Sequence, residues 1–190
     1  MEYRFATVDD IEAVSELQKK YHVSTVSDED RPDGFVTTLF TPEQFKSIIE
    51  EENGLAIACD KGRVVAYAMS ASWKYWSAWP MFAFMIKDLP SVTYLGKQLS
   101  EDNSFQYGPV CVDKAYRGKG VVQNIFEFSR REFKKRFPIM ITFINKTNPR
   151  SFKAHTEKAG FEVIKSFEYN NNNYYELGYD MEKPVEKADI

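Results

Sequence analysis

The residues best suited to chemistry lie in one glycine-rich stretch in the second half of the chain. Gly118 and Gly120 follow a β-forming run at 105–112 and open an amphipathic segment with helical spacing at 118–136. A glycine-rich turn between a strand and a helix points several backbone N–H groups in one direction, with the positive end of the helix dipole behind them. Such a turn suits a phosphate or pyrophosphate, so the sequence predicts a phosphorylated cofactor.

The charge of the surrounding segment agrees with an anionic ligand. Residues 113–136 contain eight Lys and Arg against three Asp and Glu, a local net charge of +5, whereas the whole chain of 190 residues has a net charge of −3. The negative total argues against a general nucleic-acid binder, and we expect no nucleic-acid partner. His22 and His155 stand alone and the two cysteines are far apart, so we also expect no metal site.

Two common phosphate-binding motifs do not fit this stretch. A P-loop needs Gly-Lys followed by Ser or Thr, whereas Val121 follows Gly120 and offers no hydroxyl group for magnesium. A dinucleotide fingerprint needs three spaced glycines, usually close to the first strand. Neither condition is met, so the cofactor belongs to another class.

The stretch resembles the acyl-CoA loop of the GCN5-related N-acetyltransferase (GNAT) family. That family's pattern is Arg or Gln, two residues, Gly, one residue, then Gly or Ala; Arg117 and Gly120 match it, while Val122 stands where a small residue is usual. The resemblance implies that the pantetheine arm of coenzyme A pairs with the strand before the loop, and that a backbone N–H near Val112 steadies an oxyanion. It implies cofactor contacts at Val110, Cys111, Val112, Arg117, Gly118, Lys119, Gly120, Val121 and Val122.

A second match to the family lies downstream. Asn148, Ser151 and His155, followed by Gly160-Phe161, resemble a helix in which an Asn touches the cofactor and a Tyr, sometimes a His, lies near the sulfur. The resemblance implies cofactor contacts at Asn148 and Ser151, and makes His155 a candidate proton donor to the departing thiolate. The chain carries one extra residue here, because counting back from the Gly-Phe pair reaches Thr156 instead. A lone histidine on a helix can equally be a polar surface or core residue.

The proton of the amine also needs an acceptor, unless the amine binds in its neutral form. Glu101, Asp102 and Tyr107 flank or lie on the strand that the resemblance places beside the thioester. Each is a candidate base, and Tyr107 joins His155 in the predicted catalytic pair. A water molecule could relay the proton in their place.

The elements that position these residues follow from the hydrophobic pattern. Their order over residues 2–182 is a strand, two helices, three strands, a helix, a strand, a helix and two strands. The turn at 60–62 predicts an antiparallel hairpin, and the strand–helix–strand unit at 110–144 predicts a parallel crossover. We expect one α/β domain at 1–183, with a frayed charged tail at 184–190. The resemblance implies a mixed, mostly antiparallel sheet with one splayed parallel pair and helices on both faces.

Two further segments have a composition of their own. Residues Trp73–Tyr94 are crowded with aromatic side chains that could wall an acceptor pocket, fill the core or form a contact in a homodimer. A helix is expected at 81–87 within it. Residues 22–38 are rich in turn formers and predict a mobile loop. The charged N-terminus and the short apolar runs predict a cytoplasmic protein without a membrane partner.

Together these features predict an N-acetyltransferase that moves an acetyl group from acetyl-CoA to a primary amine by direct attack in a ternary complex. Holding the amine and the thioester in register can supply about 7–11 kcal/mol of the acceleration. The acceptor, a small-molecule or peptide amine, is left open. Two alternatives are a non-catalytic sensor that binds acyl-CoA and a protein-interaction module that uses the aromatic segment 73–94.

Overall fold

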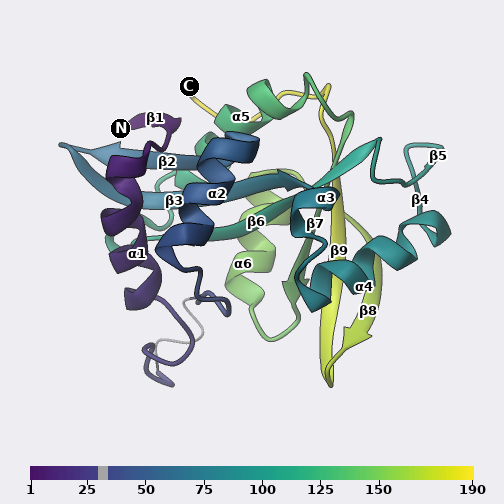
Figure 1. Ribbon diagram of the computed structural model, residues 1–190, viewed down its shortest axis with the longest axis horizontal. Coiled ribbons are helices and arrows are strands. Elements are labelled where there is room, and N and C mark those ends of the chain that lie inside the picture. The colour runs from purple at the N-terminus through teal and green to yellow at the C-terminus, as the bar shows by residue number, and fades with distance from the viewer. Residues whose placement is uncertain (30–33) are drawn as a thin grey trace.

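The computed structural model describes residues 1–29 and 34–190 (Figure 1). Within these residues a seven-stranded sheet runs in the order β1-β2-β3-β6-β7-β9-β8. Adjacent strands are antiparallel except for β6 and β7, which are parallel. The strands are β1 (Glu2–Phe5), β2 (Leu55–Asp60), β3 (Arg63–Ser72), β6 (Ser104–Val112), β7 (Ile139–Asn145), β8 (Glu162–Tyr169) and β9 (Asn172–Asp180).

Helices cover both faces of the sheet, as predicted (Figure 1). Helices α1 (Ile11–Lys20), α2 (Pro42–Glu52), α3 (Trp73–Trp76) and α4 (Pro80–Asp88) lie on one face, and α5 (Val121–Phe133) and α6 (Pro149–Lys153) on the other. A π-turn at Ala154–Lys158 extends α6. The buried apolar side chains form two clusters, one on each face. None of the helices in the described ranges is long and apolar enough to cross a bilayer.

Local sequence signals explain several element ends. The Thr41 hydroxyl accepts the Gln44 N–H while the Gln44 side chain accepts the Thr41 N–H, and Pro42 occupies the first position of α2. At the other end of the chain, Asn170 and Asn171 adopt φ values of 47° and 59° and join β8 to β9 in a tight hairpin. These local signals fix the start of α2 and the turn between β8 and β9.

The parallel pair is joined only over its first residues. Ser104–Gln106 of β6 pairs with Ile139–Ile141 of β7, and no further pairing between the two strands occurs in the described sheet. Beyond this point β6 stays bonded to β3, and β7 stays bonded to β9. The β3–β6 register shifts after Ala68, which leaves a bulge at Gly108-Pro109. The predicted splay is therefore present, and one edge of β6 is open.

The open edge carries main-chain polar groups. The Asp113 N–H donates to the Val65 carbonyl across the β3–β6 ladder. Because the direction of the N–H and C=O groups alternates along an antiparallel strand, Val110 and Val112 turn theirs away from β3 and toward the splay.

The structure differs from the sequence prediction at the C-terminal tail, at the start of α5 and in the predicted mobile loop. The C-terminal tail is not frayed: Val185 is buried, and Asp189 exchanges hydrogen bonds with Asn124 of α5. Helix α5 begins at Val121, because the two glycines before it form a loop. Part of the predicted mobile loop is held by hydrogen bonds between Val36 and its neighbours Tyr21 and Val23; its residues 30–33 lie outside the described ranges.

Candidate active site

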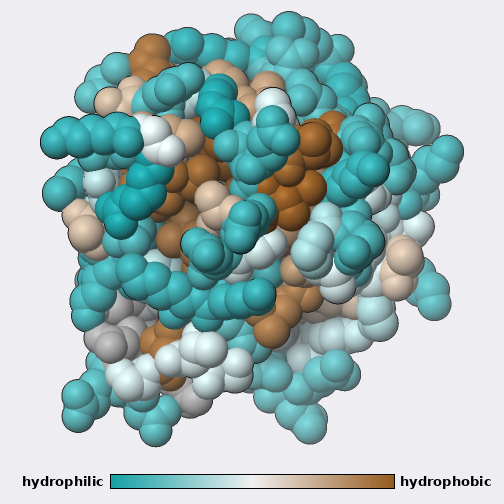
Figure 2. Space-filling view, turned by 60° about the vertical axis from the view of Figure 1, so that its left-hand side comes forward, coloured by the Kyte–Doolittle hydropathy of each residue, from teal (hydrophilic) through white to brown (hydrophobic). Residues whose placement is uncertain are grey.

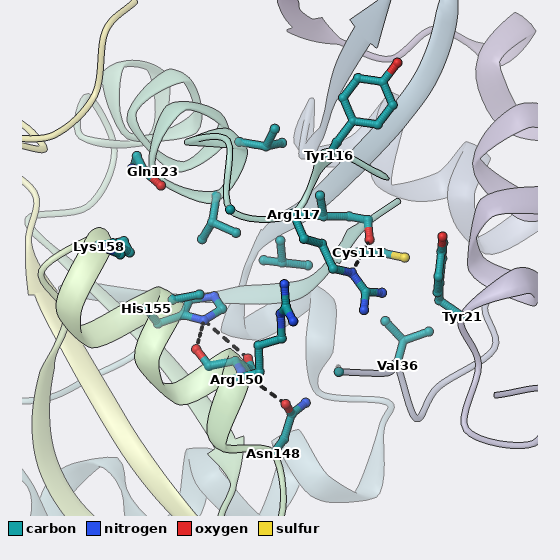
Figure 3. Close-up of a pocket in the computed structure, with 18 of the residues that line it drawn as sticks. Tyr21, Val36, Cys111, Tyr116, Arg117, Gln123, Asn148, Arg150, His155 and Lys158 are labelled. Atoms are coloured by element: carbon teal, nitrogen blue, oxygen red, sulfur yellow. Dashed lines mark hydrogen bonds between the residues drawn. The ribbon is translucent and has the colours of Figure 1, made fainter. Parts of the chain in front are cut away.

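A cavity of about 230 Å³ opens beside the free edge of β6 (Figure 3). The described residues that line it come from the end of β6, the glycine loop with the start of α5, α6 with its π-turn, and the chain near the end of α1. The part of β6 that reaches the cavity is Val110–Val112, beyond the last pair with β7. The splay therefore places open main-chain groups in a concave site.

The glycine loop offers unpaired backbone donors. Gly118 and Gly120 have φ values of 77° and 80°, a left-handed conformation that glycine adopts without strain. No backbone N–H from residues 118–122 bonds to another residue within the described ranges. The first N–H groups of a helix have no acceptor within it, and the positive end of the helix dipole lies behind them. The loop thus has the donors that the sequence predicted for a pyrophosphate.

Arg117 connects the loop to two other walls of the cavity. Its Nε donates to the Val112 carbonyl at 2.9 Å, and its guanidinium lies 4.7 Å from the centre of the Tyr21 ring (Figure 3). The Tyr21 hydroxyl in turn accepts the Lys114 N–H at 2.7 Å. Arg150 and Lys158 add positive charge from α6 and its π-turn. The charged side chains of the described lining are therefore all positive, which favours an anionic ligand.

The start of α6 is fixed by one side chain that the resemblance assigned to the cofactor. Asn148 precedes the helix, and its Oδ1 accepts the Ser151 N–H at 3.1 Å. Both residues line the cavity. Asn148 thus shapes the cavity wall by capping α6.

The segment after α6 carries one extra residue, and its π-turn determines whether His155 or Thr156 faces the cavity. The Ala159 N–H bonds to the Ala154 carbonyl, five residues back, so that one additional residue fits before Gly160. His155 lines the cavity and is 6% exposed. Thr156 is absent from the lining, and its hydroxyl donates to the Phe152 carbonyl at 2.8 Å.

The protonation of His155 follows from its contacts. Its Nδ1 lies 2.7 Å from the Ser151 carbonyl oxygen, which can only accept, so Nδ1 carries the proton of the neutral ring. Burial lowers the pKa of His155 below its usual value, and the bond to Ser151 opposes this only in part. The imidazole is therefore neutral near pH 7, with Nε2 as its acceptor.

The structure separates the predicted site residues into two groups. Tyr107 does not reach the cavity: its side chain is fully buried, and its ring contacts Phe126 and Phe161 at centroid distances of 4.9 and 6.0 Å. Burial also raises the pKa of the Tyr107 phenol well above 10. Lys119 is likewise outside the lining. The predicted residues that meet at the cavity are Val110, Cys111, Val112, Arg117, Gly118, Gly120, Val121, Val122, Asn148, Ser151 and His155.

The other candidates for the base and for the acceptor wall lie elsewhere. Glu101 and Asp102 are exposed in the turn before β6 and are not among the lining residues. Trp73 and Trp76 of the aromatic segment are fully buried in the apolar cluster on the α1–α4 face. This part of the segment fills the core.

Several lining residues escaped the sequence prediction. Arg150, Ala154 and Lys158 follow one another at helical spacing, so a stripe drawn through α6 could have found them. Tyr21 and residues 34–36 carry no such signal, because only the fold brings them to β6. The two remaining residues are Tyr116, in the link after β6, and Gln123, in the first turn of α5.

Comparison with known proteins gives the fold. No protein-family model matches the sequence, and no curated protein matches it. Solved structures match at low identity: a ribosomal-protein-alanine N-acetyltransferase from Brucella melitensis has a TM-score of 0.61 and 17% identity, over 95% of this chain and 99% of that one. The yncA protein of Salmonella typhimurium, solved with its cofactor acetyl-CoA, has a TM-score of 0.63 and 14% identity, over 100% and 98%.

A GNAT-family acetyltransferase from Streptococcus agalactiae gives a TM-score of 0.63 and 12% identity, over 94% of each chain. The protein therefore has the fold of the GNAT acetyltransferases along nearly its whole length. This agrees with the fold that the two sequence motifs predicted.

Proposed function

We propose that the protein is an acyl-CoA-dependent N-acetyltransferase that moves an acetyl group from acetyl-CoA to a primary amine. One observation carries the proposal: the amides of residues 118–122, which have no partner in the described part of the chain, stand beside the open edge of β6 in a fold shared with acetyltransferases. The yncA structure, which has this fold, contains acetyl-CoA.

The residues of the cavity fit coenzyme A in charge and in hydrogen bonding. The loop amides and the cations Arg117, Arg150 and Lys158 suit its phosphates. The open N–H groups of Val110 and Val112 suit the amide carbonyls of its pantetheine arm. The Val112 carbonyl already accepts Arg117 Nε, and its second lone pair remains for a donor on the arm.

The chemistry that acetyl-CoA supplies is an activated acetyl thioester. The chain's part is to hold that thioester beside the amine and to donate a backbone hydrogen bond to its carbonyl oxygen as negative charge develops there. Pro109 has no N–H, so the donors on this stretch of β6 are Val110 and Val112. Attack occurs directly within a ternary complex.

Cys111 does not support a covalent route. Burial raises the pKa of the Cys111 thiol to about 12, so it stays protonated and poorly nucleophilic. Its sulfur lies 3.9 Å from the Leu17 carbonyl and points toward Tyr21 in Figure 3.

The finer assignments extend the same proposal. The acceptor is the primary amine of a small molecule or peptide, and the protein acts in the cytoplasm, as a monomer or a homodimer. Burial of Trp73 and Trp76 weakens the alternative of an interaction module built on the aromatic segment. The second alternative, a sensor that binds acyl-CoA without turnover, is distinguished from an enzyme by measuring thiol release.

Two measurements, made one after the other, test the proposal. Titration calorimetry with CoA and acetyl-CoA should give saturable binding, and a panel of primary amines should contain at least one that releases free CoA thiol from acetyl-CoA. Binding without thiol release from any amine would favour the sensor. Neither heat nor a thermal shift at millimolar CoA would overturn the cofactor assignment itself.

A further inference from the structure

We propose that His155 carries a proton from the attacking nitrogen to the departing sulfur, and that it enters the reaction as a hydrogen-bond acceptor through Nε2. The inference rests on the proposed acetyl transfer and names the group that manages its proton. The resemblance made His155 only a proton donor to the thiolate. In the present proposal His155 first accepts a proton and then donates it.

The geometry of the ring supports this direction. Nδ1 is engaged by the Ser151 carbonyl at 2.7 Å, with the Ser151 hydroxyl at 3.3 Å, so this edge of the ring is turned back onto its own helix. Nε2 has no hydrogen-bond partner within the described ranges. Figure 3 shows the ring at the cavity wall, with both dashed bonds on the helix side. The free acceptor is therefore available to a ligand in the cavity.

The surroundings of the ring keep it neutral until a proton arrives. Among the described residues that line the cavity, the charged side chains are cations: Arg150 and Lys158 from its own helix, and Arg117 from the loop before α5. The Phe161 ring packs against the imidazole, with 5.2 Å between the two ring centroids. Apolar and positive neighbours both disfavour the imidazolium form. This agrees with the lowered pKa of His155, for which burial is the leading cause.

No other described group on the cavity wall can take this part. The cations offer no acceptor, and the Cys111 thiol is held protonated by burial. The Tyr116 hydroxyl donates to Asp60 at 2.7 Å, and the Tyr21 hydroxyl accepts from the Lys114 backbone. Within the described lining, His155 is the ionisable side chain with a free acceptor atom.

The proposed step balances without a further reactant. The neutral amine attacks the thioester carbon, and its nitrogen becomes an acidic ammonium in the tetrahedral intermediate. Nε2 accepts a proton from that nitrogen, the carbon–sulfur bond breaks, and its electron pair leaves on sulfur. The imidazolium then returns the proton to the thiolate, which yields the amide, CoA thiol and neutral His155.

The chain contains a reference for testing the protonation state. Its second histidine, His22, lies with Nε2 3.1 Å from the Thr37 carbonyl and accepts the Ser24 N–H at Nδ1. By the same argument as for His155, His22 carries its proton on Nε2. The two histidines should therefore be opposite tautomers.

Long-range ¹H–¹⁵N spectra of the full chain at pH 7.5 test this assignment without turnover. We expect one Nδ1–H and one Nε2–H imidazole, with His155→Gln removing the first and His22→Gln the second. An Nε2–H tautomer or an imidazolium at His155 would overturn the acceptor role, even in an active enzyme.

Kinetics test the role in the reaction, with Thr156→Val as the matched control because Thr156 is adjacent but lies outside the cavity. His155→Gln should lower kcat about 100-fold or more while CoA affinity changes less than threefold. The wild-type profile of kcat should fall on the acid side, at a pH below the usual pKa of histidine, and that limb should vanish in His155→Gln. Thr156→Val should match the wild type in both.

The outcomes separate the two proposals. A wild-type chain that acetylates no amine refutes the proposed function, and this role of His155 with it. An active wild type with unchanged kcat, or an unchanged acid limb, in His155→Gln refutes the proton transfer alone.

Discussion

Two regions of this molecule attract attention in the sequence, and the fold uses them in opposite ways. The glycine loop and the start of α6 line a cavity with main-chain donors that have no partner in the described residues. The aromatic segment 73–94 instead buries its large rings, with Trp76 in contact with Phe40 and Phe82 at centroid distances of 5.9 and 4.7 Å. Polar groups left unpaired mark the candidate site, whereas crowded aromatic rings mark the core.

The surface gives the aromatic segment no separate role. In Figure 2, hydrophobic residues gather near the middle of one face and hydrophilic residues surround them. In the aromatic segment, the exposed ring is Phe84, at 39%, which contacts the rings of Phe167 and Tyr169 on β8. Exposure of a single ring is ordinary for a globular domain, so it gives the segment no role of its own.

The largest expected effect tests the packed region. Trp76→Ala removes a fully buried ring and should lower the free energy of unfolding by about 3–5 kcal/mol in urea denaturation. Phe84→Ala, a few residues along the same segment but 39% exposed, should lower it by about 1 kcal/mol or less. Both folded variants should bind CoA like the wild type. Loss of binding in a folded Trp76→Ala protein would make the aromatic segment part of the site.

The second test concerns the loop, where the chain offers a matched control. Gly120→Glu adds bulk and a negative charge where the phosphates of CoA are expected, and calorimetry should show CoA affinity falling by at least about 100-fold (~2.7 kcal/mol). Gly62→Glu, in the β2–β3 turn, has the same left-handed backbone, with φ of 77° against 80°. Neither position has an atom within 3.5 Å of an added Cβ.

The two glycine variants should therefore share the cost of backbone strain and differ in binding. Both should lose about 1–2 kcal/mol of stability, since a side chain is unfavourable in this conformation. Gly62→Glu should keep wild-type CoA affinity. Unchanged CoA affinity in Gly120→Glu would refute the assignment of the loop.

A third test uses a buried ionisable group that Lys165 links to Asp88, at the end of α4 in the aromatic segment. Glu176 on β9 is buried beside Lys165, at 3.7 Å, and burial raises the pKa of Glu176 from 4.5 to about 7. The unfolded chain therefore loses this proton at lower pH than the folded chain does. The contribution of Glu176 to stability falls as pH rises from about 4.5 to 7, by on the order of 2 kcal/mol.

Glu176→Gln should remove that fall. Compared with the wild type, the variant should gain stability between pH 5 and pH 8, as measured by the difference in unfolding free energy at the two values. The same substitution at Glu168, which is exposed on the neighbouring strand, should leave the difference unchanged. A parallel pH dependence in Glu176→Gln and wild type would mean that Glu176 is ionised throughout.

The smallest effect concerns the predicted catalytic tyrosine. The Tyr107 hydroxyl is buried without a hydrogen-bond partner among the described residues, so Tyr107→Phe should raise stability by about 1 kcal/mol. Because the ring lies outside the cavity, kcat should stay within twofold of the wild type. A tenfold loss of kcat with unchanged stability would return Tyr107 to the reaction.

The sequence was a good guide wherever the signal was local. The turn at 60–62 predicted the hairpin that joins β2 to β3, and the helix expected at 81–87 is present as α4, because tight turns and hydrophobic spacing depend on nearby residues. It was a poor guide where partners come from afar. The tail forms hydrogen bonds with Asn124 and Glu127 of α5, and no pattern within 184–190 indicates these partners.

By itself the sequence determined the order of the elements and the loop of open amides, because glycine spacing and hydrophobic period act within a few residues. Only the tertiary structure decided what shares the cavity. It placed Tyr21 and Val36 beside β6, turned Tyr107 into the core, and used a π-turn to bring His155 rather than Thr156 to the wall. Those outcomes depend on how strands part and how helices pack over them, and these contacts join residues far apart in the chain.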